Sequence, residues 1–473
     1  MILYYNDACI FGKVEYKYMT NNMTTGKPAK LILQFMIPTC LGNIFQQFYN
    51  LADSVVAGRF IGVDALAAIG STTSLIFLVI GWLNGLTSGF SIMVAQHFGA
   101  GKYERMRRNV AMSIYLCLAF VLVMTIALEI LNYPILRLMN APDGIIDDTA
   151  GYMAVIYAGL FATAAYNGLA AVMRALGDSR SPLYFLIISA VINVFLDVAF
   201  IIWFGMGVEG CAYATVIAQA VSALLCFLYI VRKFDILKLS REDFRISFGI
   251  MGRLLSIGIP MGLQFSITAI GTIIVQGAVN VFGSVYIAGF SAAGKIQNIV
   301  STVFVAFGAT AATYVGQNRG AGRMDRVHQG VKSIQVMILV WSAVMILVIH
   351  LFGDMLIHIF IDASETEVMS AARTYFRAVA WCYPFLGSIF LYRNALQGLG
   401  YGLMPMMGGV FELIARAAIV AAVAGSFGYV GVCLADPAAW LAALVPIVPY
   451  YFYKISRISR KETHGGRITA DVI

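Results

Sequence analysis

Long apolar segments recur along the whole chain and are separated by short polar connections. Each segment has about 20 residues or more, the length of a helix that crosses the roughly 30 Å hydrocarbon core of a bilayer. Backbone polar groups in lipid must be satisfied within their own segment, and the short alternating strands of a membrane barrel are missing, so helices are predicted. Twelve such spans are predicted, over residues 31–59, 65–98, 109–135, 150–173, 182–205, 209–231, 249–282, 285–316, 331–357, 372–397, 405–425 and 429–453.

The composition is that of an integral membrane protein. Of 473 residues, 60% are hydrophobic and 12% are charged, and the mean hydropathy is +0.82. A soluble fold has too little interior to bury that much apolar surface. The lipid bilayer is therefore the expected surrounding of most of the chain.

The charge of the connections predicts an orientation. Lys and Arg concentrate in every second connection and in the tail, at residues 99–109, 173–182, 231–245, 316–326, 392–402 and 453–467. The connections between them are acidic or neutral, at residues 139–151, 205–210 and 361–368. Because basic connections stay on the cytoplasmic side, we expect a multi-pass protein of the plasma (inner) membrane with both termini in the cytoplasm. The net charge of +8 reflects this bias, and no nucleic-acid partner is expected.

The chain repeats itself. The stretches MVAQHFGAGKYERMRRNV (93–110) and YVGQNRGAGRMDRVHQGV (314–331) share the pattern Q-x-x-G-A-G-[KR]-x-[ED]-R, directly after the second span of each half. MRALGDSRSP (173–182) and LQGLGYGLMP (396–405) each close a fourth span, again about 220 residues apart. Two six-helix halves follow, and because six is even they insert as parallel repeats.

The predicted fold class is therefore an all-α integral membrane protein with twelve transmembrane helices in two parallel six-helix repeats. The expected parts are an N-terminal arm (1–30), an N-lobe (31–232), a cytoplasmic linker (233–248), a C-lobe (249–453) and a cytoplasmic tail (454–473). The seven cysteines are scattered without metal-binding spacing, and no Walker motif occurs. We expect no disulfide framework, no zinc site, no cofactor and no enzymatic activity.

Several motifs carry a family resemblance. The paired Q-x-x-G-A-G loops, IPTCLGNIFQQFYNLADSVVAGRFIGVDALAAIG (37–70) and RALGDSRSPLYFLIISAVINVFLDVAFI (174–201) resemble the multidrug and toxic compound extrusion (MATE) transporters over residues 28–455. The resemblance implies two bundles around a central V-shaped cavity, working as a monomer. It also implies secondary antiport, in which small-molecule organic cations leave in exchange for H+ or Na+.

Two carboxylates lie deep in spans of the first half, where a buried charge is costly and marks function by default. Tyr49 and Asp53 share a helix face, as do Asn193 and Asp197, because each pair is spaced i,i+4. The resemblance to the branch with an N-lobe coupling site carries over onto these four residues and Thr215. Two neighbouring carboxylates raise each other's proton affinity, and with the amide and hydroxyl oxygens they also suit sodium. The plain alternative is that both acids cap helices or pair with an arginine.

Further residues are candidates for a hinge, a charge network and a cavity lining. The resemblance makes Pro38 the hinge of the first helix, and the C-lobe lacks the acids that a C-lobe-coupled branch carries in its seventh and tenth spans. Charged side chains in apolar stretches of the C-lobe are predicted to form a structural network or to contact substrate: Lys295, Glu412 and Arg416. Polar side chains predicted to line the cavity are Gln46, Gln264 and Gln276.

Two other functions compete with antiport. The first is a flippase of a lipid-linked oligosaccharide or peptidoglycan precursor, which usually adds two spans and has a strongly basic cavity, whereas Asp53 and Asp197 suit a cation. The second is an intramembrane aspartyl protease, but the sequences NLAD and VFLD lack the glycine of its G-x-G-D motif. Cation-coupled export is the preferred interpretation.

Overall fold

The structure is a computed structural model that describes residues 22–139, 142–362 and 364–463. Those residues form helices joined by short connections, with no strand among them, which confirms the predicted fold class. The α-helices of the first half are α1 (Pro28–Phe60), α2 (Val63–Gly99), α3 (Tyr103–Ile130), α4 (Asn132–Leu138), α5 (Ile146–Ala158), α6 (Leu160–Ala175), α7 (Arg180–Val198) and α8 (Val208–Lys233). Those of the second half are α9 (Phe248–Asn280), α10 (Ser284–Gly320), α11 (Met324–His358), α12 (Thr366–Val379), α13 (Tyr383–Gly398), α14 (Leu403–Cys433) and α15 (Ala435–Thr463).

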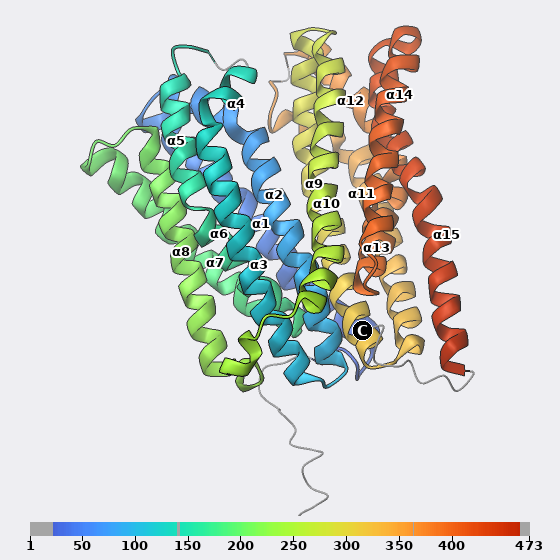
Figure 1. Ribbon diagram of the computed structural model, residues 1–473. Coiled ribbons are helices and arrows are strands. Elements are labelled where there is room, and N and C mark those ends of the chain that lie inside the picture. The colour runs from blue at the N-terminus through green and yellow to red at the C-terminus, as the bar shows by residue number, and fades with distance from the viewer. Residues whose placement is uncertain (1–21, 140–141, 363, 464–473) are drawn as a thin grey trace, which may run out of the picture.

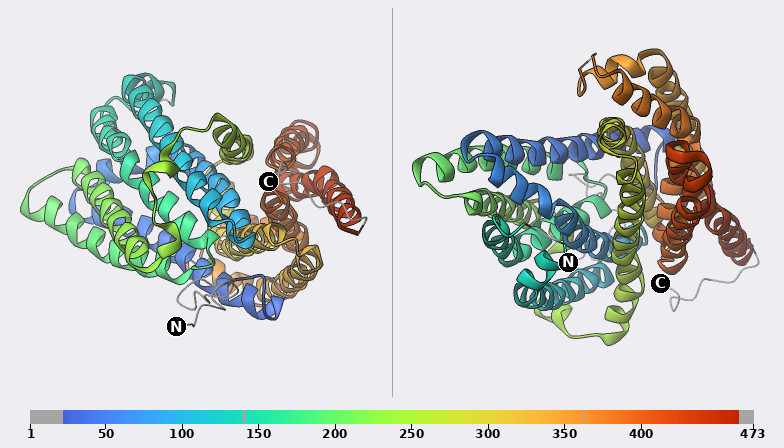
Figure 2. Two further views of the ribbon diagram at one scale, coloured as in Figure 1. Left: turned by 60° about the horizontal axis from the view of Figure 1, so that its bottom comes forward. Right: turned by 90° about the horizontal axis from the view of Figure 1, so that it is seen from above.

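The helices run between two ends of the molecule, and the halves lie side by side (Figure 1). In the part of the chain that the structure describes, nine helices are long and apolar enough to span a bilayer, or ten when the bent pair α5 and α6 is counted as one span. Helix α1 and the α12–α13 pair run between the same two ends, which makes twelve segments (Figure 1). The two halves are seen as separate groups of helices when viewed along the spans (Figure 2).

One end of the molecule collects the connections rich in Lys and Arg. These connections follow α2, α6, α8, α10 and α13, and α1 begins and α15 ends on the same side (Figure 1). We call this side the basic end and the other the opposite end. The longest of the basic connections, between α8 and α9, contains two short 3-10 turns, Asp235–Leu237 and Arg241–Phe244.

The fourth span of each half is broken, where the sequence predicted continuous helices. In the first half, α5 and α6 meet at Gly159 with a bend of 45°. In the second half, a 3-10 turn at Ala380–Cys382 separates α12 from α13. A run of hydropathy does not report such a break, because both pieces are equally apolar.

The last two spans also end elsewhere than predicted. The sequence placed a connection between residues 425 and 429, but α14 continues to Cys433 and contains a local break at Gly428, whose φ is 59°. Helix α15 continues to Thr463, beyond the predicted end at residue 453. Hydropathy marks where a helix leaves the lipid, whereas the helix itself can continue into water as long as its backbone bonds are made.

Helix α1 belongs to both halves. Its first turns bury Ile32, Phe35 and Met36 in the hydrophobic core of the second half. Its later part buries Val56 in a core of the first half. Pro38, which cannot donate a backbone hydrogen bond and therefore weakens a helix locally, lies inside α1 between these two regions.

The halves pack backbone to backbone where α2 passes α9. A Cβ added at Gly85 would lie 2.5 Å from the carbonyl oxygen of Met261, and one at Gly89 would lie 2.6 Å from the Cα of Gly258. Only glycine permits two backbones to approach this closely. The contact lies in the part of α2 that is nearer the basic end.

Candidate functional site

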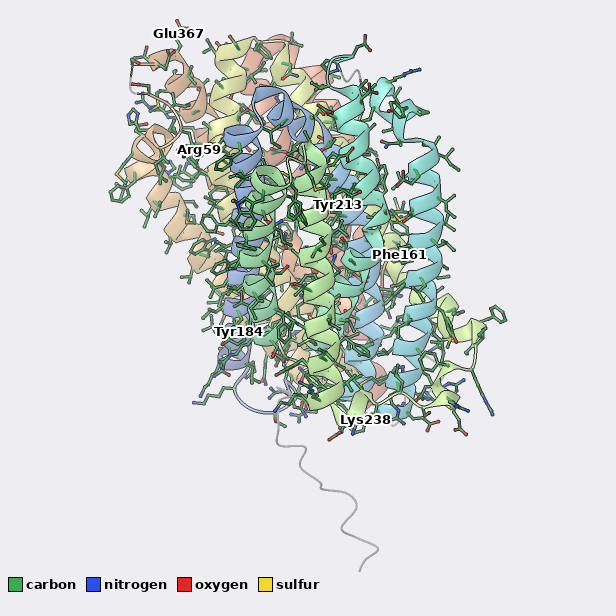
Figure 3. The ribbon with its side chains drawn as sticks, turned by 90° about the vertical axis from the view of Figure 1, so that its left-hand side faces the viewer. Arg59, Phe161, Tyr184, Tyr213, Lys238 and Glu367 are labelled. Carbon is green, nitrogen blue, oxygen red and sulfur yellow. The ribbon has the colours of Figure 1, made fainter. Side chains whose placement is uncertain are left out.

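Helix α7 carries a polar stripe on its buried face. Ser189, Asn193 and Asp197 follow one another at i,i+4 spacing, and Asn193 and Asp197 are 0% exposed. The other face carries exposed apolar side chains such as Phe195, and Tyr184 points outward from the bundle (Figure 3). A helix with this pattern turns its polar stripe towards the interior of the bundle.

Helix α8 brings Thr215 to the same level. The Ser189 hydroxyl donates to the carbonyl oxygen of Ala218 at 2.7 Å, which fixes the register of the antiparallel pair. One turn further towards the opposite end, α7 carries Asn193 and α8 carries Thr215, which is half-buried. Asp197 lies one turn beyond that, two residues before a π-helical segment, Ala199–Trp203. π-Helical turns occur frequently at functional sites.

Helix α1 brings residue 53 close to this level as well. A Cβ at Gly42 would lie 3.9 Å from the Leu183 side chain of α7. Both helices start at the basic end, so counting the same number of residues along each places residue 53 at the height of Val194. The side chains of Tyr49 and Asp53 lie outside the described residues, and their part in a site stays a prediction.

The buried amide of Asn193 has unused bonding capacity. Neither its nitrogen nor its oxygen has a hydrogen-bond partner among the residues that the structure describes. A buried polar group without a partner costs about 1–3 kcal/mol, and native structures usually supply water, an ion or a ligand to such a group. The amide oxygen of Asn193, the Asp197 carboxylate and the Thr215 hydroxyl are donor types that suit Na+, and they can equally hydrogen-bond around a protonated carboxyl group.

The second half contains a buried network of ionic side chains. The Glu412 carboxylate lies 3.3 Å from Nη1 of Arg393 and 3.6 Å from Nη1 of Arg416. Nε of Arg416 lies 2.9 Å from Oδ1 of Asp436, whose other oxygen accepts a hydrogen bond from the Tyr375 hydroxyl at 3.4 Å. Two cations face two anions, so the network is neutral as a whole.

The sequence identified only part of this network. Glu412 and Arg416 were predicted as members of a network. Arg393 was assigned to the basic connection 392–402, whereas the structure places it inside α13, where it is 7% exposed. Lys295 does not join them: its side chain is exposed, with Nζ 5.1 Å from the ring centroid of Phe360. Asp436 was missed, although an acid inside the predicted span 429–453 was a usable signal.

The three predicted glutamines do not form one cluster. Gln264 is buried and accepts a hydrogen bond from Nε2 of Gln397 at 3.0 Å. Gln276 donates to Asn280 on its own helix at 2.9 Å. Gln46 is half-buried on α1, and a role for any of them in a cavity stays a prediction.

The repeated Q-x-x-G-A-G motif joins the two halves at the basic end. Nε2 of Gln96 donates to the carbonyl oxygen of Gly398 at 2.8 Å, and Nε2 of Gln317 donates to that of Ala175, also at 2.8 Å. Both carbonyls belong to the last turn of a helix, where intrahelical donors run out. Each half therefore caps the fourth span of the other half, and we call this pair of bonds the glutamine clasp.

The glycines of the motif make the clasp possible. A Cβ at Gly99 would overlap the carbonyl oxygen of Gln317, and a Cβ at Gly320 would overlap that of Gln96. The ends of α2 and α10 thus pack against one another by the same contact in both directions. The described structure is closed at the basic end.

Two bundles of six spans, joined at one end and carrying buried polar groups within the spans, define a helical membrane transporter built from two repeats. The MatE family model matches residues 38–199 and 260–422, once in each half. The chain belongs to this family, as the sequence predicted.

Relatives extend over nearly the whole chain. The chain is 28% identical over 440 residues to the "Probable multidrug resistance protein YoeA" of Bacillus subtilis, covering 90% of this chain and 94% of that protein. It is 23% identical over 436 residues to the "FAD transporter" of Shewanella oneidensis, covering 89% of this chain and 93% of that protein. One solved structure superposes on this chain with a TM-score of 0.86 at 22% identity, covering 93% of this chain and 99% of that one. Its title is "Outward-facing conformation of a multidrug resistance MATE family transporter of the MOP superfamily". This last match supports the fold.

Proposed function

We propose that the chain is a secondary antiporter that exports organic, mostly cationic compounds in exchange for H+ or Na+. The observation that carries the proposal is the fully buried pair of Asn193 and Asp197, at the level of residue 53 and Thr215 on neighbouring helices. A carboxylate in that position is costly in a bilayer and is kept where a cation compensates it. The coupling site consists of Tyr49, Asp53, Asn193, Asp197 and Thr215.

The site couples the two fluxes through competition. Asp53 and Asp197 are charged when they release the coupling cation, and a proton or Na+ neutralises them when it binds. A ligand shifts a two-state equilibrium only by its differential affinity for the two states. Bound cation therefore favours one arrangement of the halves, and bound substrate favours the other.

The basic end is the cytoplasmic side in this proposal. The Lys and Arg distribution supports it through the positive-inside rule, and it puts both termini in the cytoplasm of a cell bounded by the plasma membrane. Because the glutamine clasp joins the halves at the basic end, the described arrangement would receive the coupling cation from outside. The lobes are residues 31–232 and 249–453, with 233–248 as the linker between them.

The test is transport in proteoliposomes. A fluorescent organic cation is offered while a proton gradient or a sodium gradient is imposed separately, with the wild type and with Asp197→Asn and Asp53→Asn. We expect one gradient to drive the wild type and neither to drive the variants. Glu129→Gln is the matched control, since Glu129 is an exposed acid on α3 and should transport as the wild type does.

Two outcomes would contradict the proposal. Gradient-driven transport by Asp53→Asn and Asp197→Asn at wild-type rates would remove both acids from coupling. Transport of an anion such as a flavin nucleotide in place of the cation would follow the name of the Shewanella relative, and movement of a labelled lipid-linked sugar would favour the flippase.

A further inference from the structure

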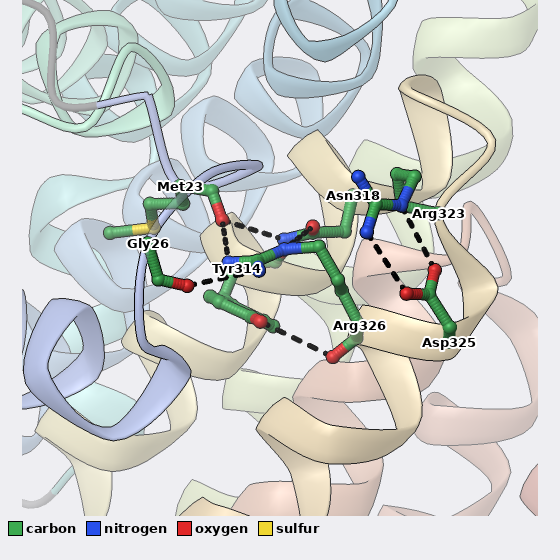
Figure 4. A network of polar contacts seen from close by, with 7 residues as sticks. All are labelled: Met23, Gly26, Tyr314, Asn318, Arg323, Asp325 and Arg326. Carbon is green, nitrogen blue, oxygen red and sulfur yellow. Dashed lines mark hydrogen bonds and ion pairs between the residues drawn. The ribbon is translucent and has the colours of Figure 1, made fainter.

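A short segment ahead of α1 binds to the second half of the molecule, although it leads into the first (Figure 4). The backbone N–H of Met23 donates to Oε1 of Gln317 at 2.9 Å. The carbonyl oxygen of Met23 accepts from Nδ2 of Asn318 at 3.2 Å and from Nη2 of Arg326 at 3.1 Å. Nη1 of Arg326 also donates to the carbonyl oxygen of Gly26 at 3.0 Å.

The surface that receives this segment is an organised site. Gln317 and Asn318 are 0% exposed and Arg326 is 7% exposed. Nε of Arg326 donates to Oδ1 of Asn318 at 3.1 Å, which orients the guanidinium, and the Tyr314 hydroxyl donates to the Arg326 carbonyl at 3.2 Å. Hydrogen bonds from a charged donor are about twice as strong as neutral ones.

The side chain of Met23 completes the binding. It is 1% exposed and packs into the hydrophobic core of the second half. The site therefore takes a backbone turn through its carbonyl and N–H groups and one apolar side chain through its core. Within the predicted N-terminal arm (1–30), we call residues 22–26 alone the arm from here on, and this surface the arm site.

The arm and the glutamine clasp meet at one side chain. The oxygen of the Gln317 amide accepts from the arm, while its nitrogen donates to Ala175 of the first half. An amide held at both ends has its orientation fixed, and neighbouring hydrogen bonds strengthen one another in a poorly solvated setting. Loss of the arm would free Gln317 to rotate away from Ala175.

The arm also anchors the start of α1. Ile32, Phe35 and Met36 pack in the second half, whereas Val56 packs in the first. If the halves separate at the basic end, the early part of α1 must either stay with the second half or leave it together with the arm. The bound arm favours the first of these outcomes and holds the basic end closed.

We propose that the arm site on α10 and α11 is a binding site for residues 22–26 of the same chain, and that its occupation stabilises the arrangement closed at the basic end. Arg326 and Gln317 are positioning residues in this device. The proposal uses neither the identity of the substrate nor that of the coupling cation, so it stands or falls separately from the proposed function.

The experiment measures access to the contact between the halves. Ile257 is 3% exposed in a cluster formed by α2, α3 and α9, and Ile257→Cys is introduced into a variant without native cysteines. The rate of its reaction with a polar maleimide is measured in nanodiscs. The test variant is Arg326→Ala. Arg323→Ala is the matched control, because Arg323 belongs to the same motif, is exposed and pairs with Asp325 (Figure 4).

We expect Arg326→Ala to react on the order of tenfold faster, the effect of losing hydrogen bonds from a charged donor. Arg323→Ala should stay within about twofold of the parent, since exposed ion pairs contribute little. Met23→Ala, which keeps the backbone bonds and empties the apolar pocket, should give an intermediate rate and serves as the second variant if Arg326→Ala does not fold. The proposal would be overturned if a monodisperse Arg326→Ala reacted with the maleimide no faster than Arg323→Ala does. It would also be overturned if Met23→Ala reacted at the rate of the parent.

Discussion

The glutamine clasp predicts how the two arrangements of the halves should respond to a single substitution. Gln96→Ala removes one donor and leaves the carbonyl oxygen of Gly398 without its bond. Gln317→Ala does the same to the carbonyl oxygen of Ala175, whose residue is 2% exposed, and it also removes the acceptor of the Met23 N–H. In an arrangement that opens the basic end to water, these carbonyls are hydrated and the substitutions remove no bond.

The expected shift follows from this difference. An unsatisfied buried carbonyl costs about 1–3 kcal/mol, and about 1.4 kcal/mol is a factor of ten in an equilibrium constant. Each substitution should therefore shift the population towards the open basic end by about 5- to 150-fold. The two bonds are separate, so the double variant should approach the sum of the single free-energy changes unless the bonds are coupled.

Spin labels measure this population directly. Glu104→Cys on α3 and His328→Cys on α11 place one exposed label on each half near the basic end. The distance distribution should gain a longer component in Gln317→Ala and in Gln96→Ala. Gln329→Ala, an exposed glutamine on α11, is the matched control and should not change it. If both clasp variants keep the parent distribution in folded protein, the clasp does not hold the halves together.

Three further outcomes are expected. Glu412→Ala should lower the free energy of unfolding of the purified protein by about 3–5 kcal/mol, because it leaves two buried guanidinium groups opposite one carboxylate. Wild-type stability with lost transport would instead indicate a direct role of Glu412 in transport. Gly89→Leu should open the α2–α9 contact at a cost of about 1–3 kcal/mol, seen as lower stability that Gly70→Leu, which meets no atom within 4 Å, does not share. In the connection between α8 and α9, burial raises the pKa of Asp243, but hydrogen bonds from Ser240 and the charge of Arg107 outweigh it and leave the pKa below its usual value. The stability that the charged Asp243 carboxylate gives to this connection is complete above about pH 4 and is lost as the pH falls through the lowered pKa of the folded protein. Proteolysis of this connection should therefore accelerate on acidification. Asp243→Asn should be cut faster already at pH 7.

Much of the architecture was predictable because lipid imposes one rule on every span. A segment without water must satisfy its own backbone, so length and hydropathy are enough to predict helices, and the charge of the connections is enough to group them at two ends. The repeated motifs identified the two halves. The breaks at Gly159 and at Ala380–Cys382 were not predictable, because apolar residues on either side of a bend have the same hydropathy.

The polar groups likewise divide into contacts that local spacing predicts and contacts that only the packing of the helices creates. The i,i+4 spacing of Asn193 and Asp197 places them on one face of a helix from sequence alone, and the structure adds that this face is fully buried and level with Thr215. Glu412 and Arg416 are neighbours by spacing, but Arg393 and Asp436 reach them from other helices. Lys295 has the same charge as Arg393 and an equally apolar sequence context, yet its side chain is exposed and lies over the ring of Phe360.

The sequence by itself determined that the motif Q-x-x-G-A-G occurs twice, at equivalent places of two parallel halves. Only the tertiary structure decided what the motif does: each glutamine caps a helix of the other half, each first glycine admits the backbone of the other motif, and one of the two glutamines also holds the arm. The physical reason is that the bonded partners lie 142 to 302 residues apart along the chain. Local spacing fixes which side chains share a helix face, whereas contacts between helices depend on how the two bundles pack.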